Sequence, residues 1–234
     1  GQGFPNDVLT NYQMSAATLL TPSSANFRQN LVSQMGRLNY GYDGRYLLTL
    51  TARRDGYSAF GTGRKYGLFP SAALAWNIHR ESFMQSQSLF SNLKLRGSYG
   101  LNGNQAVSSY SSLAKLSSAP YLTGTTVLPG YIPSSLANDN LGWESTRSIS
   151  LGLDFGILKN RVTGTIDVYS ARTQDLLLNR TISSVQGFTR ILQNIGKTAN
   201  KGLEIGLNTQ NLAKRAFTWT TSANLTLNRN EIVD

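Results

Sequence analysis

The chain has 234 residues, of which 40% are hydrophobic and 15% are charged, and its formal net charge is +10. This length suffices for one large domain, and the charged fraction lies below the about 25% of an ordinary soluble protein. The absence of cysteine excludes disulfides and thiolate metal ligands. No stretch approaches the roughly 18 apolar residues of a spanning helix. No basic run with interleaved aromatic residues occurs, so nucleic acid is not expected as a partner despite the positive charge.

The first regular pattern is a hairpin. Residues 1–30 are polar and aperiodic and are predicted to form a loop. Residues 33–41 and 45–54 then alternate, with Leu38 and Tyr40 on one face and Arg37 on the other. A period of two indicates a β-strand with two chemically different faces.

The sequence Asp43-Gly44 marks the turn of this hairpin, and its length sets the register. A two-residue loop would place aromatic residues of one strand beside polar residues of the next. A three-residue loop, Tyr42-Asp43-Gly44, pairs Tyr40 with Tyr46 and Leu38 with Leu48. We predict this second register because it keeps one face apolar.

The same alternation returns along the chain and predicts about eight strands in all. The further strands cover residues 68–78, 93–101, 144–155, 161–173, 202–209 and 217–228. Short connections are predicted near Asp43, Ile157 and Asn211, and residues 80–92 form a connection of medium length with room for a helical turn. Long connections are predicted at 55–65, 102–142 and 174–201. Alternating short and long connections are typical of outer-membrane barrels.

Each predicted strand has one apolar and one polar face. The apolar set is Leu38, Leu48, Leu74, Leu95, Leu151, Ile166, Ile205 and Leu225, and the polar set is Arg37, Thr49, Lys94, Arg96, Asp167, Glu204 and Asn224. Aromatic residues at the strand ends indicate two interfacial belts: Tyr40, Tyr46, Trp76, Phe155, Phe217 and Trp219 near the short connections, and Tyr57 and Tyr99 near the long ones. The predicted fold is all-β, a portion of a larger antiparallel up-and-down transmembrane β-barrel.

Catalytic chemistry is not predicted. His79 is the one histidine, and it lies at a predicted strand end, so no Ser-His-Asp set forms without it. The acidic residues are scattered, so no carboxylate pair for glycoside hydrolysis is visible. Neither a cofactor nor a metal site is expected.

The long segment 102–142 is the candidate binding feature. Its Tyr110, Tyr121 and Tyr131 are suited to stack on a sugar ring or pack on a peptide; alternatively they fold the loop on itself or contact a partner protein.

Several segments together resemble a known family. They are GRLNYGYDGRYLLTLTARRDGYSAFGTGRKYGLFPSAALAWNI, LKLRGSYGLNGNQ, NDNLGWE, GLDFGILKNRVTGTIDVYSARTQDLLL and NIGKTANKGLEIGLN. They are similar to the barrel of SusC/RagA-type TonB-linked outer-membrane receptors of Bacteroidetes. The resemblance implies a nutrient importer for glycans or peptides, located in the bacterial outer membrane and surrounded by its lipid. It also implies a SusD-like surface lipoprotein and the TonB complex as partners.

The resemblance further implies that residues 1–234 are an internal portion of the barrel domain. An N-terminal plug domain, which would carry the TonB contact, and the C-terminal strands are expected to lie outside this chain. Two alternatives remain open at this stage. One is a soluble all-β carbohydrate-binding module with the apolar faces turned inward, and the other is an outer-membrane adhesin or anchor barrel that does not transport.

Overall fold

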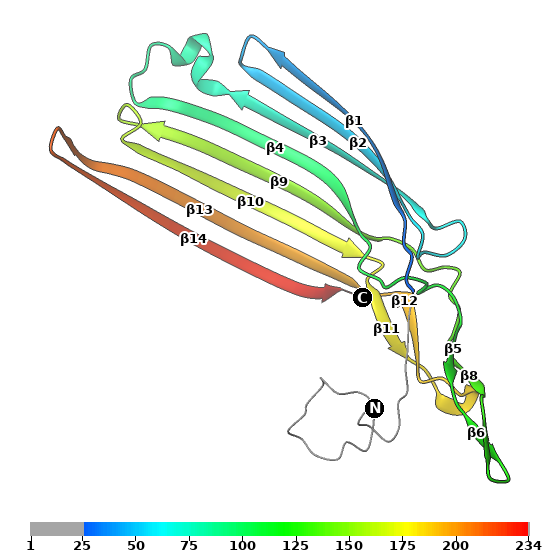
Figure 1. The fold of residues 1–234 in the computed structure, drawn as a ribbon. Helices are drawn as coiled ribbons and strands as arrows, with labels where there is room; N and C mark the ends of the chain where they lie inside the picture. Colours follow the sequence, from blue (N-terminus) through cyan, green and yellow to red (C-terminus); the bar gives the residue numbers. More distant parts are fainter. Residues whose placement is uncertain (1–25, 234) are drawn as a thin grey trace.

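The computed structural model describes residues 26–233, and its main feature is one large antiparallel sheet (Figure 1). The sheet has eight strands in the order β1-β2-β3-β4-β9-β10-β13-β14. Strands that are neighbours in this sheet follow one another in the sequence, with the short strands β5–β8 and β11–β12 lying in the connections. Their bounds are β1 Leu31–Tyr42, β2 Tyr46–Tyr57, β3 Tyr66–Asn77, β4 Phe90–Asn104, β9 Glu144–Ile157, β10 Val162–Gln174, β13 Lys197–Lys214 and β14 Phe217–Val233. The predicted fold class and strand number are confirmed.

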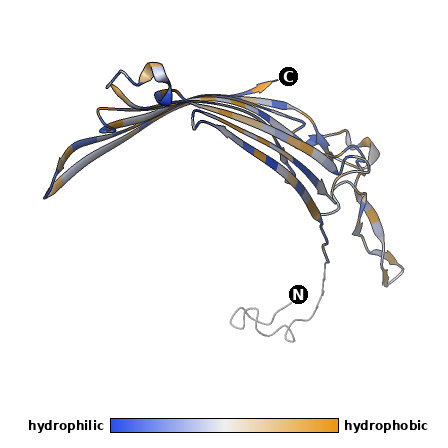
Figure 2. Cartoon of the chain, turned by 90° about the horizontal axis from the view of Figure 1, so that it is seen from above, coloured by the Kyte–Doolittle hydropathy of each residue, from blue (hydrophilic) through white to orange (hydrophobic). Residues whose placement is uncertain are grey.

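The sheet is curved and open. Figure 2 shows it as an arc rather than a closed ring, and β1 and β14 form its two edges. Unpaired backbone groups along such edges are suited to pair with further strands. Within residues 26–233, no helix has the length and apolar character needed to cross a membrane.

Two of the long connections contain more regular structure than predicted. The segment 102–142 was expected to be loop, but β4 continues to Asn104, and four short strands follow: β5 Lys115–Ser118, β6 Tyr121–Thr123, β7 Thr126–Leu128 and β8 Tyr131–Ser135. The segment 174–201 contains β11 Leu177–Thr181, the 3₁₀ turn η5 Ser184–Gln186 and β12 Arg190–Asn194. Among residues 26–233, these short strands pair with one another, and they are too short to show the long alternation that marks the main sheet.

The connections on the opposite side are short, as predicted, with one difference in position. The medium-length connection contains the 3₁₀ turns η3 Ile78–Arg80 and η4 Ser82–Met84, which confirms the expected helical turn. The last short turn is not near Asn211, because β13 continues through a bulge between Gln210 and Leu212 and ends at Lys214. Of the predicted loop 1–30, residues 26–30 have no regular structure and residues 1–25 lie outside the described part of the chain.

The predicted register of the first hairpin is wrong by two residues. Tyr42 pairs with Tyr46 and Tyr40 pairs with Leu48. Asp43 and Gly44 both have positive φ, of 51° and 60°, and the turn is closed by a hydrogen bond of 2.9 Å from the Arg45 amide to the Tyr42 carbonyl. The loop is therefore Asp43-Gly44-Arg45. A shift of two residues preserves the facing of every side chain, so the apolar stripe is retained.

The predicted division into two faces is confirmed by the register across the whole sheet. Directly opposed residues of neighbouring strands share a face, and one such row runs Leu95–Leu153–Ile166–Ile205–Leu225. We call this side the apolar face. All eight residues predicted for it lie there by register, and the seven residues of the polar set lie on the other side, the polar face.

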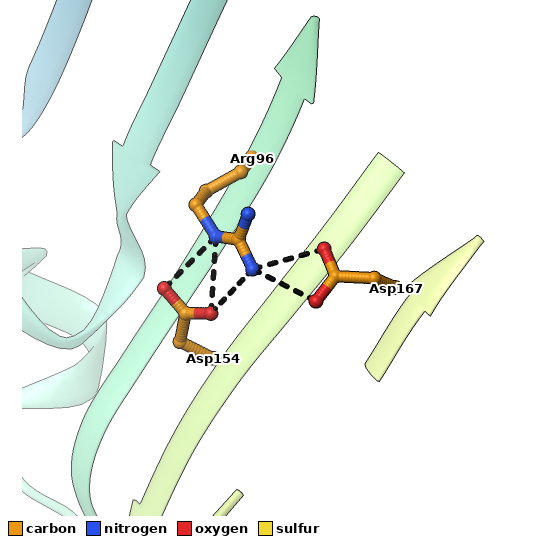
Figure 3. Close-up of polar contacts among 3 residues, drawn as sticks. All are labelled: Arg96, Asp154 and Asp167. Carbon is orange, nitrogen blue, oxygen red and sulfur yellow. Dashed lines mark hydrogen bonds and ion pairs between the residues drawn. The ribbon is translucent and has the colours of Figure 1, made fainter. Parts of the chain in front are cut away.

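An ion-pair triad ties three strands together on the polar face (Figure 3). The Arg96 guanidinium of β4 donates to both carboxylate oxygens of Asp154 on β9, and its Nη2 lies 3.0 Å from Oδ1 of Asp167 on β10. Gly152, which lies between Arg96 and Asp167 in the ladder, leaves room for this reach, since a Cβ there would lie 2.3 Å from Asp167 Oδ1. The polar face thus carries a group of charged side chains that pair with one another across three strands.

An aromatic band follows the short-connection end of the apolar face. Tyr42, Tyr46 and Trp76 stack in series, with ring centroids 6.5 and 6.3 Å apart. Glu81 in the adjoining turn is only 7% exposed, and its carboxylate accepts hydrogen bonds from the Tyr46 hydroxyl at 2.7 Å and from Trp76 Nε1 at 2.8 Å. The predicted belt residues on this side all share the apolar face.

The second predicted belt is only half correct. Tyr99 lies on the apolar face, opposite Ala72 and Ile149. Tyr57 does not, because its position in β2, opposite Leu31, turns it to the polar face, where it is 6% exposed. Its hydroxyl lies within hydrogen-bonding distance of two acceptors, Gln29 Oε1 at 2.9 Å and the Val107 carbonyl at 3.1 Å. Tyr57 is therefore a core residue of the long connections rather than an interfacial anchor.

Candidate functional site

The long connections pack around a small hydrophobic core, and we call this assembly the cap. Phe60 and Leu141 are 1% and 0% exposed, and Tyr57 and Ala59 complete the buried cluster. Val107, Trp143, Leu177 and Leu192 surround it. These residues come from the β2–β3, β4–β9 and β10–β13 segments, so three connections far apart in sequence form one folded unit at one end of the sheet.

The segment 138–143 holds the three connections of the cap together. The Asn138 side chain donates to the Leu192 carbonyl at 2.7 Å. The Asn194 side chain bonds both the amide and the carbonyl of Gly142, at 2.8 and 2.9 Å. Trp143 Nε1 donates to the Lys65 carbonyl at 3.0 Å. Buried backbone groups of the loops thus find partners, and the cap gains a defined shape.

Gly61 marks the closest approach within the cap. Its amide donates to the Leu141 carbonyl at 2.8 Å, and a Cβ at this position would lie 2.0 Å from the Asp139 carbonyl oxygen. Only glycine permits this contact between two backbones. The Gly-rich sequence after β2 therefore serves close packing of the β2–β3 connection against the β4–β9 connection.

A hollow of about 330 Å³ opens on the polar face beside the cap. It is lined by Arg53, Asp55, Phe69, Asn102, Gly103, Asn104, Gln105 and Trp143. Phe69 and Trp143 meet edge to face with centroids 5.3 Å apart, and Arg53 Nε donates to Asp55 Oδ1 at 2.8 Å. Aromatic surface surrounded by amide, carboxylate and guanidinium groups is suited to bind a polar organic molecule without fixed catalytic geometry.

The remaining part of the β4–β9 connection forms a projecting arm, residues 115–135. Strands β5 and β8 pair at its base and β6 and β7 at its tip, and Figure 1 shows it extending away from the main sheet. Tyr121 and Tyr131 lie on the arm and are 54% and 69% exposed. Exposed Leu122, Val127 and Ile132 accompany them, so the arm presents a contact surface instead of packing into the cap.

The structure separates the three tyrosines predicted as contact residues. Tyr121 and Tyr131 lie on the arm, but Tyr110 lies before it, in a turn with φ of +61°. The Tyr110 hydroxyl accepts a hydrogen bond of 3.1 Å from the Arg28 amide. Tyr110 therefore contacts the segment before β1, whereas the arm tyrosines are exposed and open to a ligand or partner.

Sequence reasoning missed the residues that shape the cap and the hollow. Phe60 and Leu141 lie in predicted loops, Trp143 lies between a predicted loop and a predicted strand, and none of these three residues, nor Asn102 or Asn104, is predicted to contribute to a site. The segment Asn138–Glu144 was noticed only for its family resemblance, although a Leu and a Trp amid polar loop residues are a signal of local burial. His79 lies in η3 at the opposite end of the sheet, with Nδ1 3.4 Å from the Leu93 carbonyl.

The two-faced sheet with a folded cap at one end has close relatives. Residues 2–233 match the family TonB dependent receptor-like, beta-barrel. The chain belongs to this family of TonB-dependent receptors. It is 40% identical over 228 residues to TonB-dependent receptor P3 of Formosa agariphila, covering 97% of this chain and 23% of that protein. It is 38% identical over 244 residues to TonB-dependent receptor SusC of Bacteroides thetaiotaomicron, covering 99% and 23%.

Solved structures place the chain in the same group of TonB-dependent receptors. The structure of the RagAB peptide transporter superposes with a TM-score of 0.81 and 28% identity, covering 87% of this chain and 22% of that one. The resemblance to SusC/RagA-type receptors is therefore confirmed. The chain spans under a quarter of the length of these relatives.

Proposed function

We propose that this chain is part of the barrel wall and outer mouth of an outer-membrane importer that takes up glycans or peptides. The observation that carries the proposal is the division of the sheet. One face carries rows of exposed leucine, isoleucine and valine, and the other carries the Arg96 triad and other polar groups. In a membrane barrel, the first face contacts lipid and the second lines the lumen.

The placement of the connections supports one orientation. Backbone outside the hydrocarbon region is free of the demand for complete internal pairing, so long irregular segments are tolerated there. Barrels of the bacterial outer membrane have short periplasmic turns and longer extracellular loops. The cap and the arm would then be extracellular, and the hollow beside the cap would lie at the mouth of the lumen.

The chemistry of the mouth supports a polar organic substrate. Phe69 and Trp143 supply aromatic surface, and Asn102, Asn104 and Asp55 supply hydrogen-bonding groups. Sugar rings and peptides both use this combination. Similarity to SusC and to the RagAB peptide transporter is consistent with either class. The arm would contact the substrate or a SusD-like surface lipoprotein, and the TonB complex would act through a part of the receptor outside this chain.

The test is an arm deletion in the full-length receptor expressed in its host. Residues 116–133 are replaced by a short Gly-Ser link, which keeps the Lys115–Ser135 pair at the arm's base. Uptake of labelled oligosaccharides and peptides is measured, together with co-purification of the surface lipoprotein. We expect loss of uptake or of lipoprotein binding while the receptor remains folded in the outer membrane.

A matched pair of variants separates the two roles of the arm. Tyr121→Ala with Tyr131→Ala removes both rings, and Tyr121→Phe with Tyr131→Phe retains them. If the rings stack on substrate, the Ala pair reduces uptake and the Phe pair does not. Normal uptake and normal lipoprotein binding after deletion of the arm would contradict its proposed role, and a receptor that supports no uptake even when intact would favour a non-transporting barrel.

A further inference from the structure

Basic side chains gather on the apolar face at its cap end, where an uncharged surface would suit lipid tails. Arg147 lies four residues before Leu151 in β9 and therefore shares its face. Register places Arg172 of β10 directly opposite Arg147, and Arg229 of β14 directly opposite Lys201 of β13. Lys197 lies one row nearer the cap end than Arg172, opposite Gln174. We call these five residues the basic border.

The pairing within the basic border is unfavourable in the protein alone. Directly opposed residues on a sheet have Cβ atoms about 5 Å apart, and like charges there are destabilising. Arg147, Arg172, Lys197 and Lys201 are exposed, and within residues 26–233 none of them has an ion-pair partner or a side-chain hydrogen bond. Only Arg229 pairs with a carboxylate, that of Glu231. In a lipid-facing position, an external anion would offset this repulsion.

An apolar groove continues directly from the basic border toward the middle of the sheet. Its volume is about 490 Å³, and Lys201 and Arg229 form its cap end. The remainder of its outward lining is aliphatic, from Ile149, Leu151, Val168, Leu203 and Leu227. Ser170, which lies opposite Lys201, fills little space between these larger side chains. Cations at one end and aliphatic surface along the rest match an anionic head group attached to a hydrocarbon chain.

We propose that the basic border binds the phosphate groups of a phosphorylated lipid in the outer leaflet, with an acyl chain in the adjoining groove. The proposal rests on the outer-membrane placement proposed above. Phosphate oxygens accept hydrogen bonds from guanidinium groups in bidentate geometry, so one phosphate bridges Arg147 and Arg172 and another engages Lys201. The lipid thereby relieves the like-charge repulsion and fixes the height of β9, β10, β13 and β14 in the membrane.

The experiment uses the full-length receptor, extracted from outer membranes in mild detergent and stripped of lipid. Binding of lipid A is measured by native mass spectrometry with a phosphorylated probe and with a phosphate-free probe of the same acyl chains. The test variant combines Arg147→Gln, Arg172→Gln and Lys201→Gln. A control combines Lys159→Gln, Lys214→Gln and Arg215→Gln, which removes equal charge at the short-connection end.

We expect the test variant to bind the phosphorylated probe on the order of 100-fold more weakly, since each basic residue near a membrane surface contributes several-fold. The control should bind within a few-fold of wild type, and a charge-retaining variant, Arg147→Lys with Arg172→Lys and Lys201→Arg, should bind more tightly than the test variant, because it keeps the charge although it loses the bidentate geometry. The charge-retaining variant also shows that altered binding does not come from misfolding. Inorganic phosphate should not displace the lipid, because it does not occupy the groove.

Three results would overturn the proposal: equal binding of both probes to wild type, unchanged binding by the test variant, or displacement by inorganic phosphate at the probe's own concentration. Each of these can occur with a receptor that lies in the outer membrane and imports substrate normally. Recovery of the native full-length receptor without detergent is a different result, since it would contradict the membrane placement itself.

Discussion

Arg96 on β4 reaches across β9 to Asp167 on β10, with its Nη2 3.0 Å from Oδ1, while the same guanidinium holds Asp154. The side chain of Arg96 is 38% exposed, so water screens part of the interaction. We predict that Arg96→Gln costs roughly 1–2 kcal/mol of unfolding free energy, because it leaves two neighbouring carboxylates without a cation. Urea unfolding of the full-length receptor in detergent measures this cost. Adding Asp154→Asn should recover part of it, and a further loss in the double variant would contradict the triad's role.

The opposite facing of neighbouring residues on β14 predicts opposite responses to one substitution. Leu225 lies in the apolar row with Ile205, and Asn224 faces the other side, opposite Gly206. Leu225→Arg should destabilise the inserted barrel by roughly 2–4 kcal/mol, whereas Asn224→Arg should be tolerated in the lumen. The comparison is made on folded receptor recovered from outer membranes. Equal recovery of the two variants would mean that the apolar face does not contact lipid.

Orientation in the membrane is measured by cysteine labelling. The chain has no cysteine, so single substitutions in an otherwise cysteine-free receptor report one site each. Ser118 lies exposed on the arm and Arg215 lies exposed in the β13–β14 turn. A membrane-impermeant maleimide applied to whole cells should label a cysteine at position 118 and not one at 215. The reverse pattern would mean that the cap faces the periplasm.

Gly61 offers a test of the cap that leaves the barrel unaltered. A methyl group there would meet the Asp139 carbonyl oxygen, and overpacking of this kind costs typically about 1–3 kcal/mol. Gly61→Ala should therefore make the β2–β3 and β4–β9 connections more sensitive to protease added to intact cells. Gly36→Ala is the matched control, since a Cβ at that position has nothing within 4 Å. Unchanged proteolysis of Gly61→Ala would show that the two backbones separate freely.

Glu81 predicts a pH dependence at the short-connection end. Hydrogen bonds from the Tyr46 hydroxyl and, with a smaller effect, from Trp76 Nε1 stabilise the carboxylate of Glu81 and lower its pKa below the ordinary value. A lowered pKa in the folded state contributes stability above the unfolded pKa of glutamate, and that stability is lost as the pH falls through the folded pKa. Acidification below the ordinary pKa of glutamate should therefore loosen this turn, detected as a change in Trp76 fluorescence. Glu81→Gln should abolish that change, and an identical acid response in the variant would assign it to another group.

The sequence by itself determined the two faces of the sheet. Side chains of a strand alternate with a period of two, so the facing of Leu95 or Asp167 could be predicted without knowing its neighbours. The number of main strands followed for the same reason. Family resemblance in segments such as Asn138–Glu144 indicated the correct group of receptors, although it did not indicate what those residues contact.

Only the tertiary structure decided which residues oppose one another. The first hairpin's register depended on the positive φ of Asp43 and Gly44, and shifts of two residues keep the same faces and so leave no trace in the pattern. Phe60 and Leu141 form one core although they lie far apart in the chain. The opposition of Arg147 and Arg172 likewise arises from the register of β9 against β10. Alternation is a local property of each strand, whereas burial and charge contact depend on which strands come together.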